Sequence, residues 1–105
     1  VMNRPQVANA MNTVMGGELR DLFRSIVNDT DGLRCVVLTG AGGKVFCAGA
    51  DLKERHSMNH EEWRRQHSLF ESVALAIMDC PSMIENRKKS SKTQLFISIE
   101  FIYFI

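Results

Sequence analysis

The alternation of hydrophobic and polar positions predicts a long helix near the start of the chain. Within residues 13–27, apolar side chains recur every three or four positions, as they do on one face of an α-helix. Asn12 comes directly before this pattern, and asparagine is a favoured N-cap residue. We therefore expect a helix over 13–27, with this apolar stripe: Met15, Leu19, Leu22, Phe23 and Ile26.

The same period returns in a second stretch, which opens with "SMNHEEW". Asn59 followed by Glu62 resembles a capping box, in which two side chains and two backbone N–H groups bond reciprocally. Pro81 disfavours helical conformation at Cys80 and ends the pattern. We expect a second long helix whose apolar stripe is Trp63, Phe70, Val73, Ala74 and Ile77.

Between the two helices, "RCVVLTG" (34–40) is short, apolar, β-branched and closed by glycine. Such a run is typical of a strand buried on both faces in a parallel sheet. A strand followed by a helix and another strand makes a βαβ unit, so the fold class is α/β. A strand preceding the first helix would have to lie before Val1.

The chain changes character from Ser82 onward. The polar, basic "ENRKKSSK" is followed by "LFISIEFIYFI" (95–105), which is almost wholly apolar. This run is too short for a membrane-spanning helix, which needs about 20 apolar residues. Its β-branched and aromatic content favours a strand. A segment of this composition is also prone to aggregate.

Composition narrows the class of protein. A chain of 105 residues with 45% hydrophobic residues and a net charge of +1 fits one small soluble domain. Such a balance argues against a dedicated nucleic-acid binder, which needs a basic face. The three cysteines show no CxxC spacing, which favours a reducing compartment. Because residues 1–11 contain no long apolar segment, we expect no signal peptide and no secretion.

The glycine loop "GAGGK" after the strand suggests phosphate binding, but its spacing fails. A P-loop has a glycine six residues before the lysine, where this chain has Leu38, and Ser or Thr after it. A dinucleotide loop has a third glycine where this chain has Val45. A tight turn that lets the strand exit is the preferred interpretation.

Metal and thiol chemistry are weakly indicated. His56, His60 and His67 would share a face only if one helix ran through all three, but residues 57–59 interrupt it. We expect solvated histidines rather than a zinc site. Cys47 ends an apolar stretch without a local Cys–His signature, so a buried, inert thiol is preferred over a nucleophile.

The stretch "VFCAGADLKER" (45–55) places small residues directly before what resembles a helix start near Asp51. N–H groups at 50–53 would then lack intrahelical partners and could hold a developing oxyanion, or a phosphate assisted by Lys53. A close-packed helix–strand junction explains the spacing equally well. Asp51 and Glu54 fit the helix dipole, with an acid–base role as the alternative.

Three segments in order resemble the crotonase superfamily, also called enoyl-CoA hydratase/isomerase: "NRPQVANAM", "VVLTGAGGKVFCAGADLKE" and a helix ending in "DCP". The resemblance covers residues 3–81. It implies a partial, truncated crotonase-like (ClpP/crotonase) spiral fold, with residues 1–81 as the N-terminal part of that domain. Residues 82–105 do not match the family, and we interpret them as a frame-shifted or intron-derived tail.

The resemblance also implies a function. Family members bind acyl-CoA thioesters and stabilise an enolate, with coenzyme A as part of the substrate and no prosthetic group. The backbone N–H of Ala50 would be one oxyanion donor. Leu52 would lie near the adenine and Lys53 near the phosphates, while Gln6 stands where many relatives have Lys or Arg. The implied CoA-binding positions are Gln6, Val7, Ala8, Ala48, Ala50, Asp51, Leu52 and Lys53.

The resemblance further implies homo-oligomers (trimers or hexamers) and a bacterial cytoplasmic or mitochondrial location. The second oxyanion donor and both catalytic glutamates of hydratases would follow Pro81, where this sequence does not match. We therefore expect little hydratase activity. The alternatives are a non-catalytic CoA-binding or oligomerising fragment, or a truncated gene product without function.

Overall fold

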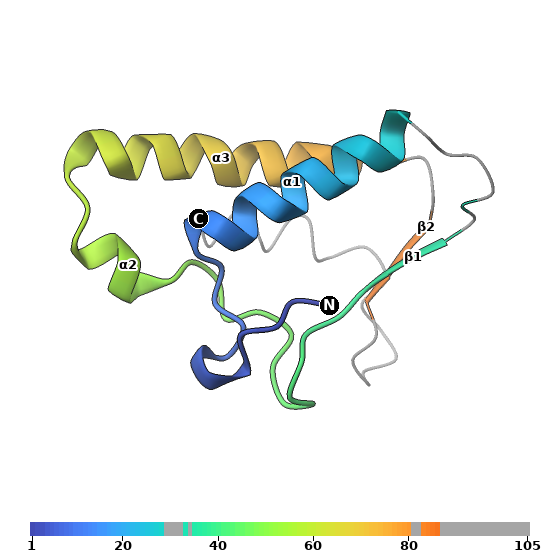
Figure 1. Cartoon of the computed structure of the whole chain (residues 1–105), viewed down its shortest axis with the longest axis horizontal. Helices are drawn as coiled ribbons and strands as arrows, with labels where there is room; N and C mark the ends of the chain where they lie inside the picture. The colour runs from blue at the N-terminus through green and yellow to red at the C-terminus, as the bar shows by residue number, and fades with distance from the viewer. Residues whose placement is uncertain (29–32, 34, 81–82, 87–105) are drawn as a thin grey trace.

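The computed structural model describes residues 1–28, 33, 35–80 and 83–86 of the chain. Two long helices lie side by side, and a pair of strands lies beside one end of them (Figure 1). The elements in chain order are the 3-10 turn η1 (Pro5–Val7), α1 (Thr13–Asn28), β1 (Cys35–Leu38), α2 (Leu52–His56), α3 (His60–Met78) and β2 (Met83–Asn86).

The core lies between α1 and α3, as the two apolar stripes predict. Phe23 of α1 and Phe70 and Val73 of α3 are fully buried. Leu22 was expected in the same stripe, but it is 52% exposed. Because successive helix positions are rotated by about 100°, the helix cannot direct both Leu22 and Phe23 at α3.

Gly16 explains how closely the two helices approach. A Cβ at this position would lie 2.8 Å from Cε1 of Phe70, whereas a Cβ at Gly17 would meet nothing within 4 Å. Glycine lowers helix propensity, but at position 16 it makes room for the phenylalanine ring.

The predicted start of α3 is confirmed. Asn59 accepts a hydrogen bond from the N–H of Glu62, and the Glu62 carboxylate accepts one from the N–H of Asn59, which completes the capping box. The predicted stripe needs one correction, because Trp63 is 37% exposed whereas Gln66 is only 2% exposed. The polar contacts of Gln66 account for its burial.

The strands β1 and β2 pair in parallel, with Cys35 opposite Met83 and Leu38 opposite Asn86. Together with α3 they form a βαβ unit, but not the predicted one, in which the strand at 34–40 came second, after the helix at 13–27. Burial of β1 on both faces was wrong: Val37 is 45% exposed, although Leu38 is buried. Among the described residues the sheet has two strands, and the core that buries Leu38 covers one of its faces. The sequence pattern did not predict β2, and the strand expected at 95–105 lies outside the described residues.

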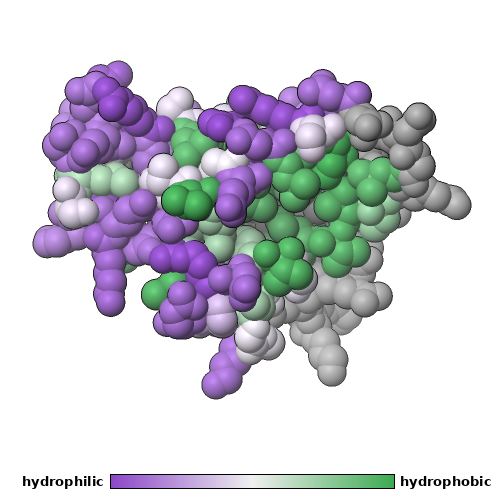
Figure 2. Space-filling view, viewed as in Figure 1, coloured by the Kyte–Doolittle hydropathy of each residue, from purple (hydrophilic) through white to green (hydrophobic). Residues whose placement is uncertain are grey.

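An apolar groove lies open beside α1. Figure 2 shows hydrophobic side chains gathered over the centre and the sheet end of one face, and hydrophilic ones at the α2 end. The groove is lined in part by Val1, Val14, Leu19, Leu22 and Leu38. Within the described part of the chain, no helix combines the length and apolar character needed to cross a membrane.

Candidate functional site

Asn9 ties the N-terminal loop to the glycine loop. Its side chain is almost completely buried, and its Oδ1 accepts the Arg4 N–H at 2.9 Å. Its Nδ2 donates to the carbonyls of Ala41 (2.9 Å) and Val45 (2.8 Å). Both Ala8 and Asn9 have positive φ, at 53° and 55°, which turns the chain back on itself. The residues of "NRPQVAN" thus form a clamp on the following loop.

The glycine loop is a tight turn, as predicted. Gly42 and Gly43 have φ of 83° and 70°, a region that L side chains rarely adopt. At Gly40 a Cβ would meet the Phe46 carbonyl oxygen and lie 2.7 Å from Nδ2 of Asn9. These close contacts hold the glycine loop against Asn9. The chain then continues toward residue 50.

Ala50 lies opposite Met11 in a single parallel bridge. The N–H of Met11 donates to the Gly49 carbonyl at 2.7 Å, and the N–H of Asp51 donates to the Met11 carbonyl at 2.9 Å. Because backbone groups of successive extended residues alternate in direction, the N–H of Ala50 faces away from Met11. It forms no hydrogen bond with any described residue.

The start of α2 is capped by its own sequence. The Asp51 side chain is the N-cap and accepts the N–H groups of Lys53 (3.1 Å) and Glu54 (3.3 Å). The expectation that all N–H groups at 50–53 remain free is therefore wrong for Asp51 and Lys53. Within the described structure, the free donors of this stretch are Ala50 and Leu52.

Arg4 neutralises the Asp51 carboxylate. Its Nη1 lies 2.9 Å from Oδ2 of Asp51 and 2.6 Å from the Ala10 carbonyl oxygen. Hydrogen bonding by Arg4 holds the pKa of Asp51 below its ordinary value, and the N–H groups of Glu54 and Lys53 act in the same direction against burial. Asp51 is thus an ionised structural cap.

Replacing Asp51 by asparagine should change how the free energy of unfolding depends on pH in the acid range. Asparagine caps a helix about as well as aspartate, so this substitution isolates the charge. Because the pKa of Asp51 is lowered by folding, its contribution is present above the unfolded-state value of about 3.9 and is lost as pH falls through the folded value. We expect the wild-type advantage to be constant above about pH 5 and to shrink below about pH 4. Urea unfolding over a pH series measures it, and a pH-independent difference would contradict the assignment.

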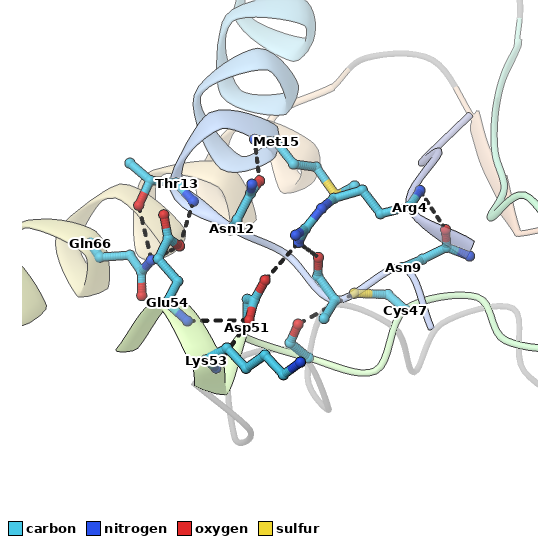
Figure 3. A network of polar contacts seen from close by, with 12 residues as sticks. Arg4, Asn9, Asn12, Thr13, Met15, Cys47, Asp51, Lys53, Glu54 and Gln66 are labelled. Atoms are coloured by element: carbon cyan, nitrogen blue, oxygen red, sulfur yellow. Dashed lines mark hydrogen bonds and ion pairs between the residues drawn. The ribbon is translucent and has the colours of Figure 1, made fainter. Parts of the chain in front are cut away.

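Glu54 joins three elements (Figure 3). Its Oε2 accepts the N–H of Thr13, the first residue of α1, at 2.9 Å and Nε2 of Gln66 in α3 at 2.7 Å. The same Nε2 lies 3.0 Å from Oγ1 of Thr13. The sequence led us to expect Glu54 to serve the dipole of its own helix, but its carboxylate also serves the N-terminus of α1.

Arg55 completes this network from α2. Its Nε donates to Oε1 of Gln66 at 2.8 Å. The guanidinium carbon lies 5.4 Å from the ring centroid of Trp63 and 5.6 Å from that of Phe70. The sequence analysis missed Gln66, although a signal exists: it lies four residues before Phe70 and seven before Val73, on the buried stripe.

The model of the family described as enoyl-CoA hydratase/isomerase matches residues 1–84. The chain belongs to this family. YngF of Bacillus subtilis, which carries the name enoyl-CoA hydratase/isomerase, is 42% identical over 78 residues, which are 74% of this chain and 29% of YngF. The short-chain-enoyl-CoA hydratase of Clostridium acetobutylicum is 44% identical over 64 residues, which are 61% of this chain and 24% of that protein.

Solved structures of the family agree with the fold. The enoyl-CoA hydratase of Bacillus anthracis matches with a TM-score of 0.73 and 36% identity, over 79% of this chain and 32% of that one. An enoyl-CoA hydratase of Mycobacterium smegmatis gives the same TM-score and identity, over 80% and 32%. The predicted α/β, crotonase-like fold is confirmed, and this chain spans about a third of these neighbours.

The predicted CoA-binding residues lie on two segments that the structure brings together. Gln6 and Val7 belong to η1 and Ala8 follows it as its C-cap, and Ala48 to Lys53 precede and begin α2. The N–H of Ala48 donates to the Ala8 carbonyl at 3.1 Å and joins the two segments. The side chains of Gln6, Leu52 and Lys53 are exposed, whereas that of Asp51 is buried.

The remaining candidate residues are the three histidines and Cys47. His56 belongs to α2, whereas His60 and His67 belong to α3, and His67 stacks on Trp63. Burial raises the pKa of the Cys47 thiol, which favours the inert form that the sequence predicts.

Proposed function

We propose that the backbone N–H of Ala50 binds the thioester carbonyl oxygen of an acyl-CoA and stabilises negative charge on it. The free donor at Ala50 is the observation that carries the proposal. It faces away from Met11, and its neighbours Ala48 and Gly49 carry little or no side chain that could obstruct a ligand. A preorganised N–H directed at a developing oxyanion is a strong catalytic device.

The proposal assigns the CoA portion to the two segments joined by Ala8 and Ala48. Lys53 is an exposed cation for the phosphates, and Leu52 is an exposed apolar contact for the adenine. Gln6 offers a neutral hydrogen-bonding side chain. The family relatives support this assignment, because several are named as enoyl-CoA hydratases.

Hydration of an enoyl group also needs an acid and a base within hydrogen-bond reach of the reacting atoms. The two carboxylates that follow Ala50 are already engaged, Asp51 by Arg4 and Glu54 by Thr13 and Gln66. We therefore assign neither of these two carboxylates the role of acid or base, and the proposal covers thioester binding and carbonyl polarisation. In this respect it matches the alternative of a non-catalytic CoA-binding fragment.

A backbone ester tests the donor directly. Semisynthesis through ligation at Cys47 and Cys80 can replace the 49–50 amide by an ester, which removes the Ala50 N–H and weakens the Gly49 carbonyl as an acceptor. We expect affinity for butyryl-CoA to fall roughly threefold to tenfold, as for loss of one hydrogen bond, with affinity for CoA unchanged. Isothermal titration calorimetry measures both.

An ester at the 51–52 amide is the matched control, because the Leu52 N–H is also free and each ester weakens one accepting carbonyl. The Gly49 carbonyl accepts from Met11, and the Asp51 carbonyl accepts from Arg55. The control should bind butyryl-CoA like wild type. Equal losses from both esters, or no butyryl-CoA binding by wild type, would contradict the proposed function.

A further inference from the structure

The Glu54 carboxylate contacts residues 11–13, the short segment that contains Met11, the bridge partner of Ala50. Met11 bonds to both neighbours of Ala50, and Thr13 follows Met11 by two residues. The Thr13 N–H donates to Glu54 Oε2. Residues 11–13 are therefore attached to the stretch 49–54 at both ends, with the free N–H of Ala50 between the attachments.

The N-terminus of α1 interacts favourably with the negative charge of the Glu54 carboxylate. No acidic residue occurs in the first turn of α1, although a negative charge there is favourable. The Asn12 side chain accepts the Met15 N–H, which leaves the Thr13 N–H to another acceptor. Glu54, which belongs to α2, provides both this acceptor and the negative charge at the N-terminus of α1.

Gln66 fixes the other side of the same carboxylate. Its amide nitrogen donates to Glu54, and its amide oxygen accepts from Arg55, so one buried side chain holds two consecutive residues of α2. Breaking a buried polar network costs more than losing an exposed pair, because the remaining partners stay desolvated.

We infer that Glu54 and Gln66 are a positioning pair that sets the direction of the Ala50 N–H by anchoring α2 to α1 and α3. This inference rests on the proposed function, since it names the residues that orient its donor. Neither side chain needs to touch the ligand. Both act through the segment that begins at Asp51.

The pair consists of one carboxylate and one amide, so exchanging these two groups tests it. Glu54→Gln places an amide against the Gln66 amide and removes the charge at α1. Gln66→Glu places two carboxylates together. The double variant Glu54→Gln/Gln66→Glu restores one carboxylate and one amide and should rescue the pairing. Glu61→Gln is the matched control, because Glu61 pairs with Arg65 on the exposed surface of α3.

Amide hydrogen exchange by NMR tests the anchor without a ligand. The N–H groups of Asp51 and Arg55 report on it, because they donate to the carbonyls of Met11 and Asp51. We expect each single variant to exchange roughly tenfold faster at these two amides, the factor for a charge-assisted bond of about 1.4 kcal/mol. The double variant and Glu61→Gln should exchange like wild type.

Polarisation of bound [1-¹³C]butyryl-CoA tests positioning rather than stability alone. A directed hydrogen bond lowers the infrared stretching frequency of the thioester carbonyl. We expect that shift to be reduced in both single variants and restored in the double variant. Val73→Ala, which destabilises the core away from α2, should keep the wild-type shift.

Unchanged exchange at Asp51 and Arg55 in Glu54→Gln would overturn the positioning pair, whatever the ligand does. A carbonyl shift that falls equally in Val73→Ala would also overturn it. A wild-type chain that binds no butyryl-CoA would instead refute the proposed function, and the exchange data would still decide the anchor.

Discussion

Replacing Asn9 by alanine is expected to lower the free energy of unfolding by about 3–5 kcal/mol. The substitution removes both donors from the buried carbonyls of Ala41 and Val45 and the acceptor from the Arg4 N–H. It also leaves alanine at a φ of 55°, where asparagine is better tolerated. Urea denaturation followed by circular dichroism measures the loss.

Two further substitutions separate the causes. Asn9→Gly relieves the backbone strain but not the lost hydrogen bonds, so it should be more stable than Asn9→Ala by about 1 kcal/mol. Asn9→Asp keeps an acceptor for Arg4 but directs a carboxylate oxygen at two carbonyls, so it should be as damaging as alanine. An Asn9→Ala chain within about 0.5 kcal/mol of wild type would show that the clamp is dispensable.

Replacing Phe70 by alanine should cost about 3–5 kcal/mol, the usual range for a buried phenylalanine. The ring has no exposed surface, fills the space that Gly16 leaves, and lies beneath the Arg55 guanidinium. Its removal therefore opens a cavity at the contact of α1 with α3. The midpoint and slope of urea unfolding measure the change.

Leu75→Ala is the matched control on the same helix. Leu75 is 55% exposed, and an exposed substitution that keeps helix propensity should change stability by no more than about 0.5 kcal/mol. Similar losses at positions 70 and 75 would mean that α3 does not present its predicted face to α1.

The helices could be predicted because their signals are local. Asn12 accepts the Met15 N–H and Asn59 forms a capping box, and both caps follow from residues three or fewer positions away. Gln66 lies on the stripe of Phe70 and Val73, but a polar residue there is buried only because Glu54 and Arg55 of α2 bond to its amide. The exposure of Leu22 has no such local signal.

The candidate site was predicted in part. The resemblance identified the segment that carries Ala50, and the bridge with Met11 explains why its N–H has no partner among the described residues. The roles of Asp51 and Glu54 depend on residues 47 and 41 positions away, namely Arg4 and Thr13. A pattern within one helix turn carries no information about such partners. β2 was missed because its "MIEN" sequence lacks a strong strand pattern, and its pairing with β1 defines it.

The sequence by itself determined the positions of α1 and α3, the turn at the glycine loop, and membership of the enoyl-CoA hydratase/isomerase family. These features depend on caps, periodicity and glycine conformations that act over a few residues. Only the tertiary structure decided which N–H groups of the described stretch 50–53 lack a partner and that Asp51 and Glu54 are engaged. A buried polar group must find a partner wherever the fold places one, and here those partners lie tens of residues away along the chain.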